Sequence, residues 1–275
     1  MLLVDVHAHM DHPAYKDDLD DVLERAKKVG VKAIIAQGVT HEVNLKVLEL
    51  AKKHSVIKPA LGLYPLDALN ILEFRKKDGE LMEIESADEY KNITETSVDD
   101  TLAFIEENKD KIVAIGEVGM DFAYSESEEE RELQKDNFRK IISLAKKIKK
   151  PLIIHTRKAE AEVIDILDES KINPNLVVLH CFSGNKKKIK RAVELGYYFS
   201  IPTNIDRSEH FQMMISLVKL DHLLTETDSP YLAPNKAPRN EPANIKLTIE
   251  KIAELKGMVA EEVANAIFMN YQRLF

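Results

Sequence analysis

Two histidines separated by one residue lie close to the start of the chain, in the segment Asp5-Val6-His7-Ala8-His9. The segment follows the apolar run Leu2-Leu3-Val4, which is typical of a buried β-strand. Alternate side chains of a strand share one face, so Asp5, His7 and His9 are predicted to point the same way. Neutral imidazole binds zinc, manganese or iron, and a neighbouring carboxylate can orient the ring. The segment therefore indicates a divalent metal site; two structural histidines at a strand end are the alternative.

Four other polar clusters follow short apolar runs in the same way. They are Gly116-Glu117-Val118-Gly119-Met120-Asp121, His155-Thr156-Arg157, His180-Cys181-Phe182-Ser183-Gly184 and Glu226-Thr227-Asp228-Ser229-Pro230. Burial of a charged or polar side chain at the end of a hydrophobic strand costs free energy unless a metal or a partner satisfies it. Because the pattern recurs, it favours a metal site over a chance arrangement.

Eight apolar runs alternate with stretches of helical periodicity, which is the pattern of repeated βα units around a parallel sheet. The expected strands lie at residues 2–4, 32–36, 57–61, 112–115, 152–154, 176–179, 197–201 and 223–224. The expected helices lie at residues 19–29, 43–51, 127–150, 158–171, 185–195, 207–219, 244–256 and 260–273. Eight such units joined by right-handed crossovers close into an α/β fold, the (β/α)8 barrel, and 275 residues are enough for one barrel domain spanning 1–275.

The segment from residue 66 to residue 100 interrupts this rhythm. It is too long and too charged for an ordinary turn after the third strand. Its apolar residues Leu69, Ile71, Leu72 and Phe74 predict a structured insertion. We consider two interpretations, a lid over the active face and a peripheral decoration without a catalytic role.

Composition limits the kinds of partner that the chain can bind. Thirty-nine basic and 47 acidic residues give a net charge of −8, which argues against holding nucleic acid by bulk electrostatics but allows local phosphate contacts. The single cysteine, Cys181, excludes an intrachain disulfide and is expected to pack in the core. No signal peptide or membrane-spanning run is recognised. These features predict a cytoplasmic protein without membrane association, and no obligate protein partner is evident.

The C-terminal ends of the strands build the active site in a barrel of this kind. Four histidines and two carboxylates close five of the expected strands, and they exceed the ligands that one four-coordinate ion needs. We therefore expect two divalent ions, of zinc, manganese or magnesium. One ion is assigned to His7, His9, Glu117 and Asp228, and the other to Glu117, His155 and His180.

This arrangement predicts hydrolytic chemistry. Two cations about 3.5–4 Å apart lower the pKa of a water between them and stabilise charge on the attacking and leaving oxygens. The expected nucleophile is a metal-bridging hydroxide, with Glu117 as the bridging carboxylate and Asp228 as the general base. Asp5 and Glu226 are the expected supporting partners of the ligands.

The chain resembles the TatD-type metal-dependent deoxyribonucleases, within the wider amidohydrolase-like metal-dependent hydrolases. The resemblance spans nearly the whole length and rests on the five segments above, the last extended to Tyr231, and on Asn240-Glu241-Pro242-Ala243-Asn244, in the family's order and spacing. It implies a TIM barrel, a di-metal centre on the six positions named, and 3′–5′ exonucleolytic cleavage of DNA in repair or degradation. The family usually has Gly-x-His-Pro after the third strand. This chain has Gly62-Leu63-Tyr64-Pro65, so Tyr64 replaces a histidine associated with substrate or ligand-supporting contacts.

The sequence offers two candidate contacts for DNA. Arg157 suits bidentate phosphate recognition, and the basic residues 186–191 either hold neighbouring phosphates or form a solvated helix face. The acidic cluster at residues 126–132 would repel a long duplex, so single-stranded DNA or a 3′ end is the expected partner.

Two further functions stay open at this point. The same metal pair could hydrolyse a small amide, ester or lactone, or deacylate an aminoacyl-tRNA. A non-catalytic barrel that acts as a binding module is the third possibility. Its discriminating feature would be the loss of ligand residues, and all six are present.

Overall fold

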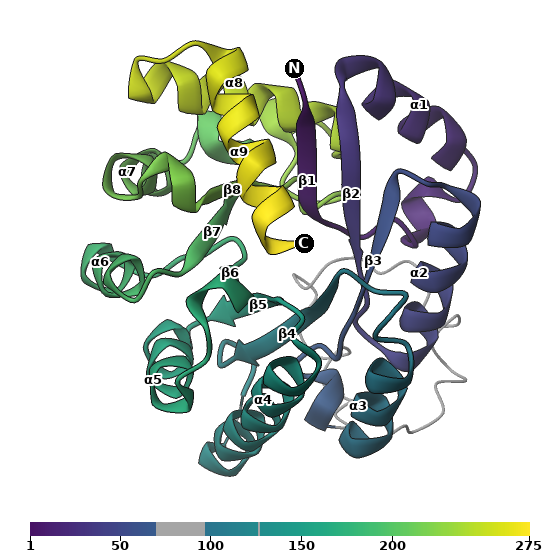
Figure 1. Cartoon of the computed structure of the whole chain (residues 1–275), viewed down its shortest axis with the longest axis vertical. Helices are drawn as coiled ribbons and strands as arrows, with labels where there is room; N and C mark the ends of the chain where they lie inside the picture. The colour runs from purple at the N-terminus through teal and green to yellow at the C-terminus, as the bar shows by residue number, and fades with distance from the viewer. Residues whose placement is uncertain (70–96, 126) are drawn as a thin grey trace.

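Eight parallel strands form one sheet in the computed structural model, which describes residues 1–69, 97–125 and 127–275. The strands neighbour one another in sequence order, as the (β/α)8 barrel prediction requires. They are β1 (Leu3–Ala8), β2 (Val31–Gln37), β3 (Ile57–Leu61), β4 (Ala114–Asp121), β5 (Leu152–Arg157), β6 (Val177–Leu179), β7 (Tyr198–Ile201) and β8 (Leu223–Thr225). The fold prediction is therefore confirmed (Figure 1).

Hydrogen bonds close the barrel between its first and last strands. The Thr225 hydroxyl donates to the Val4 carbonyl at 2.8 Å, and the His9 amide donates to the Ser229 carbonyl, also at 2.8 Å. An isolated parallel bridge joins Ala8 to Ser229 at the same seam. The closure thus brings the segment after β8 beside the end of β1, where two of the expected metal ligands lie.

Helices cover the outer surface of the sheet (Figure 1). They are α1 (Leu19–Val29), α2 (His41–Lys53), α3 (Val98–Glu107), α4 (Glu128–Ile148), α5 (Glu160–Ser170), α6 (Lys186–Glu194), α7 (Glu209–Leu217), α8 (Ile245–Lys256) and α9 (Ala260–Leu274). The last helix packs against both β1 and β8, so it covers the seam from outside. No helix of the described ranges is long and apolar enough to cross a membrane.

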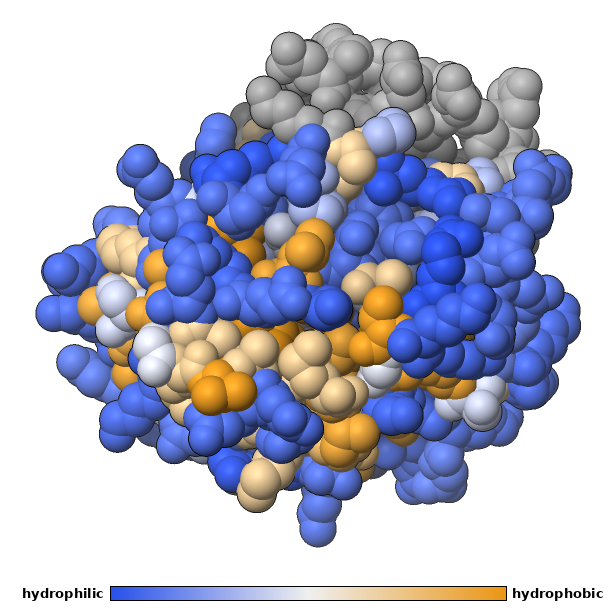
Figure 2. Space-filling view, turned by 90° about the horizontal axis from the view of Figure 1, so that it is seen from above, coloured by the Kyte–Doolittle hydropathy of each residue, from blue (hydrophilic) through white to orange (hydrophobic). Residues whose placement is uncertain are grey.

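The sequence explains why these elements form where they do. Residues of β1 and β4 are buried throughout, as expected for strands covered on both faces. Gly30 ends α1 in the left-handed region at φ 105°, and the Ser127 hydroxyl accepts from the Glu130 amide at the start of α4. The surface facing the viewer in Figure 2 is mostly hydrophilic, with apolar side chains gathered in one region.

Three sequence expectations differ from the structure. β1, β4 and β5 extend further than predicted, so His7, Glu117 and His155 lie within strands instead of following them. Helix α3 was not predicted, because it begins inside the segment assigned to the insertion; Ser97 caps it, and Thr101 and Ile105 face the core. Of the expected insertion, a short 3-10 helix at Asp67–Leu69 is described, whereas residues 70–96 lie outside the described residues.

Candidate metal centre

Glu117 occupies the middle of the candidate site, and its two carboxylate oxygens face different histidines. Oε2 lies 3.5 Å from His7 Nε2 and 3.6 Å from His9 Nε2. Oε1 lies 2.8 Å from His155 Nδ1 and 3.8 Å from His180 Nε2. One carboxylate therefore has an oxygen available for each of two groups of ligands.

His7 and His9 project from the end of β1 toward two carboxylates. Besides Glu117, both Nε2 atoms approach Asp228 Oδ1, at 3.5 Å from His7 and 3.4 Å from His9. The His7 ring stacks on the His180 ring with 3.6 Å between their centroids. Both ring nitrogens of His7 are buried without a hydrogen-bond partner in the described part of the chain, which is costly for an imidazole unless another ligand satisfies it.

The backbone holds Asp228 in a sparsely populated conformation beside these histidines. Its φ is 54°, in the left-handed region, and its amide donates to the His7 carbonyl at 2.9 Å. Strained residues of this kind cluster at functional sites. The neighbouring Thr227 amide and hydroxyl donate to Asp5 at 2.9 and 2.5 Å, and the His7 amide donates to the same carboxylate at 3.2 Å. Asp5 thus organises the backbone around the site instead of orienting an imidazole.

Glu226 fixes the orientation of His180. His180 Nδ1 lies 2.8 Å from Glu226 Oε2, which also accepts a hydrogen bond from the Ser200 hydroxyl. With the Nδ1 proton donated to this carboxylate, Nε2 faces Glu117 with a lone pair available for a metal. The sequence indicated Glu226 for a supporting position, but nothing in it indicated Ser200.

A second supporting network surrounds His155. Its Nε2 lies 2.9 Å from Asp121 Oδ2 and 3.3 Å from the Tyr64 hydroxyl, which donates to the same Asp121 oxygen at 2.9 Å. Asp121 belongs to one of the polar clusters of the sequence, but the sequence pattern assigns it no role. Its position at the end of a buried strand, the same signal that identified the ligands, could have revealed it. Tyr64 therefore contacts an expected ligand and the carboxylate that holds it.

Burial, neighbouring charges and hydrogen bonds shift the pKa values of these groups. Burial alone would raise the pKa of Glu117, but the charge of His7 and the hydrogen bond from His155 hold it well below its usual range. Burial alone would lower the pKa of His155, but hydrogen bonds with Asp121 and Glu117 raise it to about 9. Glu226 likewise outweighs burial and raises the pKa of His180 to about 10. Without a metal, His155 and His180 are therefore protonated at neutral pH and paired with buried carboxylates.

The surroundings of the site raise the pKa of Tyr64 and lower the pKa of Asp228. Burial and the adjacent Asp121 and Glu117 carboxylates raise the pKa of Tyr64 well above its usual value, so its hydroxyl remains a donor. Burial alone would raise the pKa of Asp228, but the hydrogen bond from His9 and the nearby histidine charges lower it. Asp228 is thus ionised over the neutral pH range and can accept a proton.

Basic side chains are the expected contacts for DNA phosphates. Arg157 is exposed at the end of β5, with its guanidinium 4.8 Å from the centre of the Tyr124 ring. Within the basic run 186–191, Lys188 donates to Glu160 at 2.9 Å and Arg191 pairs with Asp165. These two cations therefore tie α6 to α5, and the structure does not bring them to the metal ligands.

Cys181 follows β6 and packs partly against the hydrophobic core. Burial raises the pKa of its thiol well above the usual value. The thiol is therefore protonated at neutral pH, as expected of a packing residue.

The donor set fits a divalent metal. Three overlapping groups have ligand atoms within 4.8 Å of one another: His7, His9 and Glu117; Glu117, His155 and His180; and His7, His180 and Asp228. Imidazole nitrogens and carboxylate oxygens are ligands of zinc and manganese. The unpartnered nitrogens of His7 agree with a ligand role. The fold and the site together define a metal-dependent hydrolase built on a (β/α)8 barrel.

Comparison with known proteins identifies the family. A family model described as TatD related DNase matches residues 4–275, and the chain belongs to this family. The deoxyribonuclease TATDN3 of Homo sapiens is 35% identical over 276 residues, which cover 99% of this chain and 94% of that protein. The uncharacterized metal-dependent hydrolase YabD of Bacillus subtilis is 32% identical over 280 residues, covering 100% and 99%.

A solved structure agrees with this assignment. The crystal structure of YJJV, a TatD homolog from Escherichia coli K12, is similar with a TM-score of 0.81 at 28% identity, covering 99% of this chain and 97% of that chain. Its similarity extends over the whole barrel, so the strand ends that carry the candidate ligands lie within the matched region.

Proposed function

We propose that this chain hydrolyses phosphodiester bonds of DNA as an exonuclease acting from the 3′ end. Membership of the TatD-related DNase family supports DNA as the substrate, and TATDN3 is named as a deoxyribonuclease. The polarity follows from the family resemblance of the sequence. We further propose that residues 1–275 act as one barrel domain in the cytoplasm.

The proposal includes two divalent ions. The observation that carries it is the division of Glu117, whose Oε2 faces His7 and His9 while Oε1 faces His155 and His180. A carboxylate shared in this way suits two cations better than one. Divalent ions held there supply Lewis acidity and lower the pKa of a coordinated water.

The protein's own side chains supply proton transfer and orientation. Asp228 is the proposed general base, since its lowered pKa keeps it ionised and its side chain is 16% exposed, compared with 5% for Glu117. Glu226 and Asp121 hold His180 and His155 in the orientation that directs one nitrogen of each to Glu117. Arg157, which is exposed and follows His155 by two positions, is the proposed contact for a substrate phosphate.

A digestion experiment tests this function. Metal-stripped protein is resupplied with magnesium, manganese or zinc and mixed with single-stranded DNA labelled at the 3′ or the 5′ end. We expect a 5′-labelled strand to shorten stepwise only when metal is present, and Asp228→Asn to abolish the shortening. Absence of cleavage by protein that retains its ions would contradict the proposal and redirect the search to amides, esters or lactones.

A further inference from the structure

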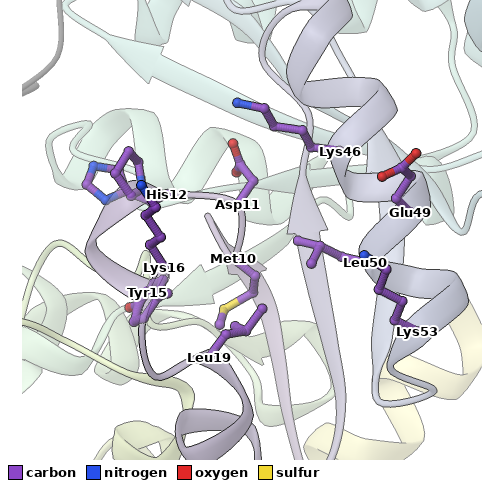
Figure 3. A pocket seen from close by; sticks show the side chains of 11 residues that line it. Met10, Asp11, His12, Tyr15, Lys16, Leu19, Lys46, Glu49, Leu50 and Lys53 are labelled. Carbon is purple, nitrogen blue, oxygen red and sulfur yellow. The ribbon is translucent and has the colours of Figure 1, made fainter. Parts of the chain in front are cut away.

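A pocket of about 270 Å³ lies between the segment that follows His9 and helix α2 (Figure 3). One side consists of the segment that follows His9, beginning at Met10 and Asp11, and the other is one face of α2. The α2 residues that line it are Lys46, Glu49, Leu50 and Lys53, which recur at helical spacing and therefore share a face. No candidate metal ligand, supporting residue or expected DNA contact described above lines this pocket.

Cations surround the pocket without being neutralised by salt bridges. Lys16, Lys46 and Lys53 are exposed, and within the described ranges none of the three forms a salt bridge. The pocket also contains two carboxylates, Asp11 and Glu49, so its formal charge is +1 in a chain of net charge −8. Figure 3 shows Lys46 reaching from α2 toward the side formed by Asp11. An anionic group suits this rim.

The floor and inner wall of the pocket are apolar and aromatic. Met10, Leu19 and Leu50 line it, and Met10 is 1% exposed. Next to them the His12 ring packs edge-on against Tyr231, with 5.6 Å between centroids. A surface with an apolar floor and a cationic rim matches a nucleotide, which carries a flat base and a phosphate.

Tyr231 connects one wall of the pocket to the metal centre. Tyr231 also contacts the ring of His9, with 5.8 Å between centroids, so one aromatic side chain joins the metal site to His12. Asp11 interacts electrostatically with both His9 and Lys46. The segment that carries the candidate ligand His9 therefore continues directly into the wall of the pocket.

We propose that this pocket, which we call the Lys46 pocket, binds the nucleotide next to the scissile phosphodiester of a single DNA strand. The lysines of the rim contact its phosphate, and the apolar floor together with His12, whose ring packs against Tyr231, receives its base. This inference rests on the proposed function, and it names the part of the substrate that lies beyond the metal ligands.

Binding measurements on a charge-neutralised pair of variants test the Lys46 pocket. The probe is fluorescein-labelled octathymidylate, and its affinity is measured by anisotropy with manganese-supplied Asp228→Asn protein. Lys46→Gln in this background is expected to raise Kd about fivefold to tenfold. It should also reduce the slope of log K against log salt by about 0.7, the value for one phosphate contact on a single strand. Lys52→Gln is the matched control, because Lys52 is an exposed lysine of the same helix that does not line the pocket.

A kinetic comparison separates this inference from the proposed function. In otherwise unaltered enzyme, Lys46→Gln should raise KM for the oligonucleotide while Lys52→Gln leaves KM and kcat unchanged. Equal effects of the two substitutions overturn the Lys46 pocket. If the enzyme cleaves DNA and Lys46→Gln binds like its parent, only the pocket inference fails. Binding that depends on Lys46 without any cleavage retains the pocket and contradicts the proposed function.

Discussion

Loading the metal-free protein with divalent ions should release protons. In the absence of metal, the pKa of His155 is raised to about 9 and that of His180 to about 10, so both are charged near neutral pH. A histidine must be neutral to bind a metal. Glu117 and Asp228 contribute no protons, because their pKa values are lowered and they are already ionised.

These directions set the size of the effect. Displacement of one proton from each of these two histidines predicts that each protein molecule releases about two protons when its metal centre is filled. The apparent association constant then rises about hundredfold for each unit of pH over the range from about 7 to about 8. The lowered pKa of His7 means that it adds little to this number, and the raised pKa of His9 increases it.

Isothermal titration calorimetry measures the release directly. Manganese is titrated into metal-stripped protein in two buffers of different ionisation enthalpy, and the difference in observed heat gives the number of protons. Glu226→Gln is the informative variant, because it removes the carboxylate that outweighs burial in raising the pKa of His180. It should release fewer protons than the unaltered protein. Release of less than one proton, or an affinity independent of pH, would refute the reasoning.

Four further outcomes are expected. Glu117→Ala should lower metal affinity and the rate of DNA cleavage by at least about a thousandfold, because both groups of ligands that contain Glu117 lose an oxygen. Equilibrium dialysis measures the loss of metal and digestion measures the loss of cleavage. Retention of two ions by this variant would contradict the assignment of Glu117 as a shared ligand. Arg157→Ala should raise KM for DNA about tenfold with the ions retained, whereas metal loss in this variant would show that Arg157 supports the centre instead. Tyr64→Phe removes the hydroxyl that donates to Asp121 and should weaken metal affinity about tenfold, and an unchanged affinity in dialysis would remove Tyr64 from the supporting network. The metal-free protein should lose thermal stability as pH rises from about 6.5 through about 10, because the pKa values of His155 and His180 are higher in the folded than in the unfolded chain. The Tm is measured over this pH range with metal-loaded protein as the control. A Tm of the metal-free protein that rises with pH would contradict these pKa directions.

Local patterns in the chain were enough to predict the barrel and to indicate candidate ligands at one of its faces. Each strand is a short apolar run, and each helix carries a stripe of its own, so both periodicities are visible without knowledge of the fold. Parallel strands of a barrel end on the same face, and this rule alone predicts that His7, Glu117 and His180 lie close together. The structure brings these side chains into overlapping groups of possible ligands.

Helix α3 shows where local patterns were insufficient. Its apolar stripe is short, and it begins within the charged segment assigned to the insertion after β3. Its place in the fold depends on packing against α4, which no periodicity of its own residues specifies.

Only the tertiary structure decided how the site is supported and what adjoins it. Tyr64 reaches His155 across 91 residues of chain, and Asp5 holds Thr227 across 222. The orientation of the Glu117 oxygens and the convergence of Lys16 and Lys46 on one pocket depend on the closed barrel in the same way. Residue types and their spacing specify which groups end a strand, but hydrogen-bond partners depend on distances of a few ångströms between elements that are remote in sequence.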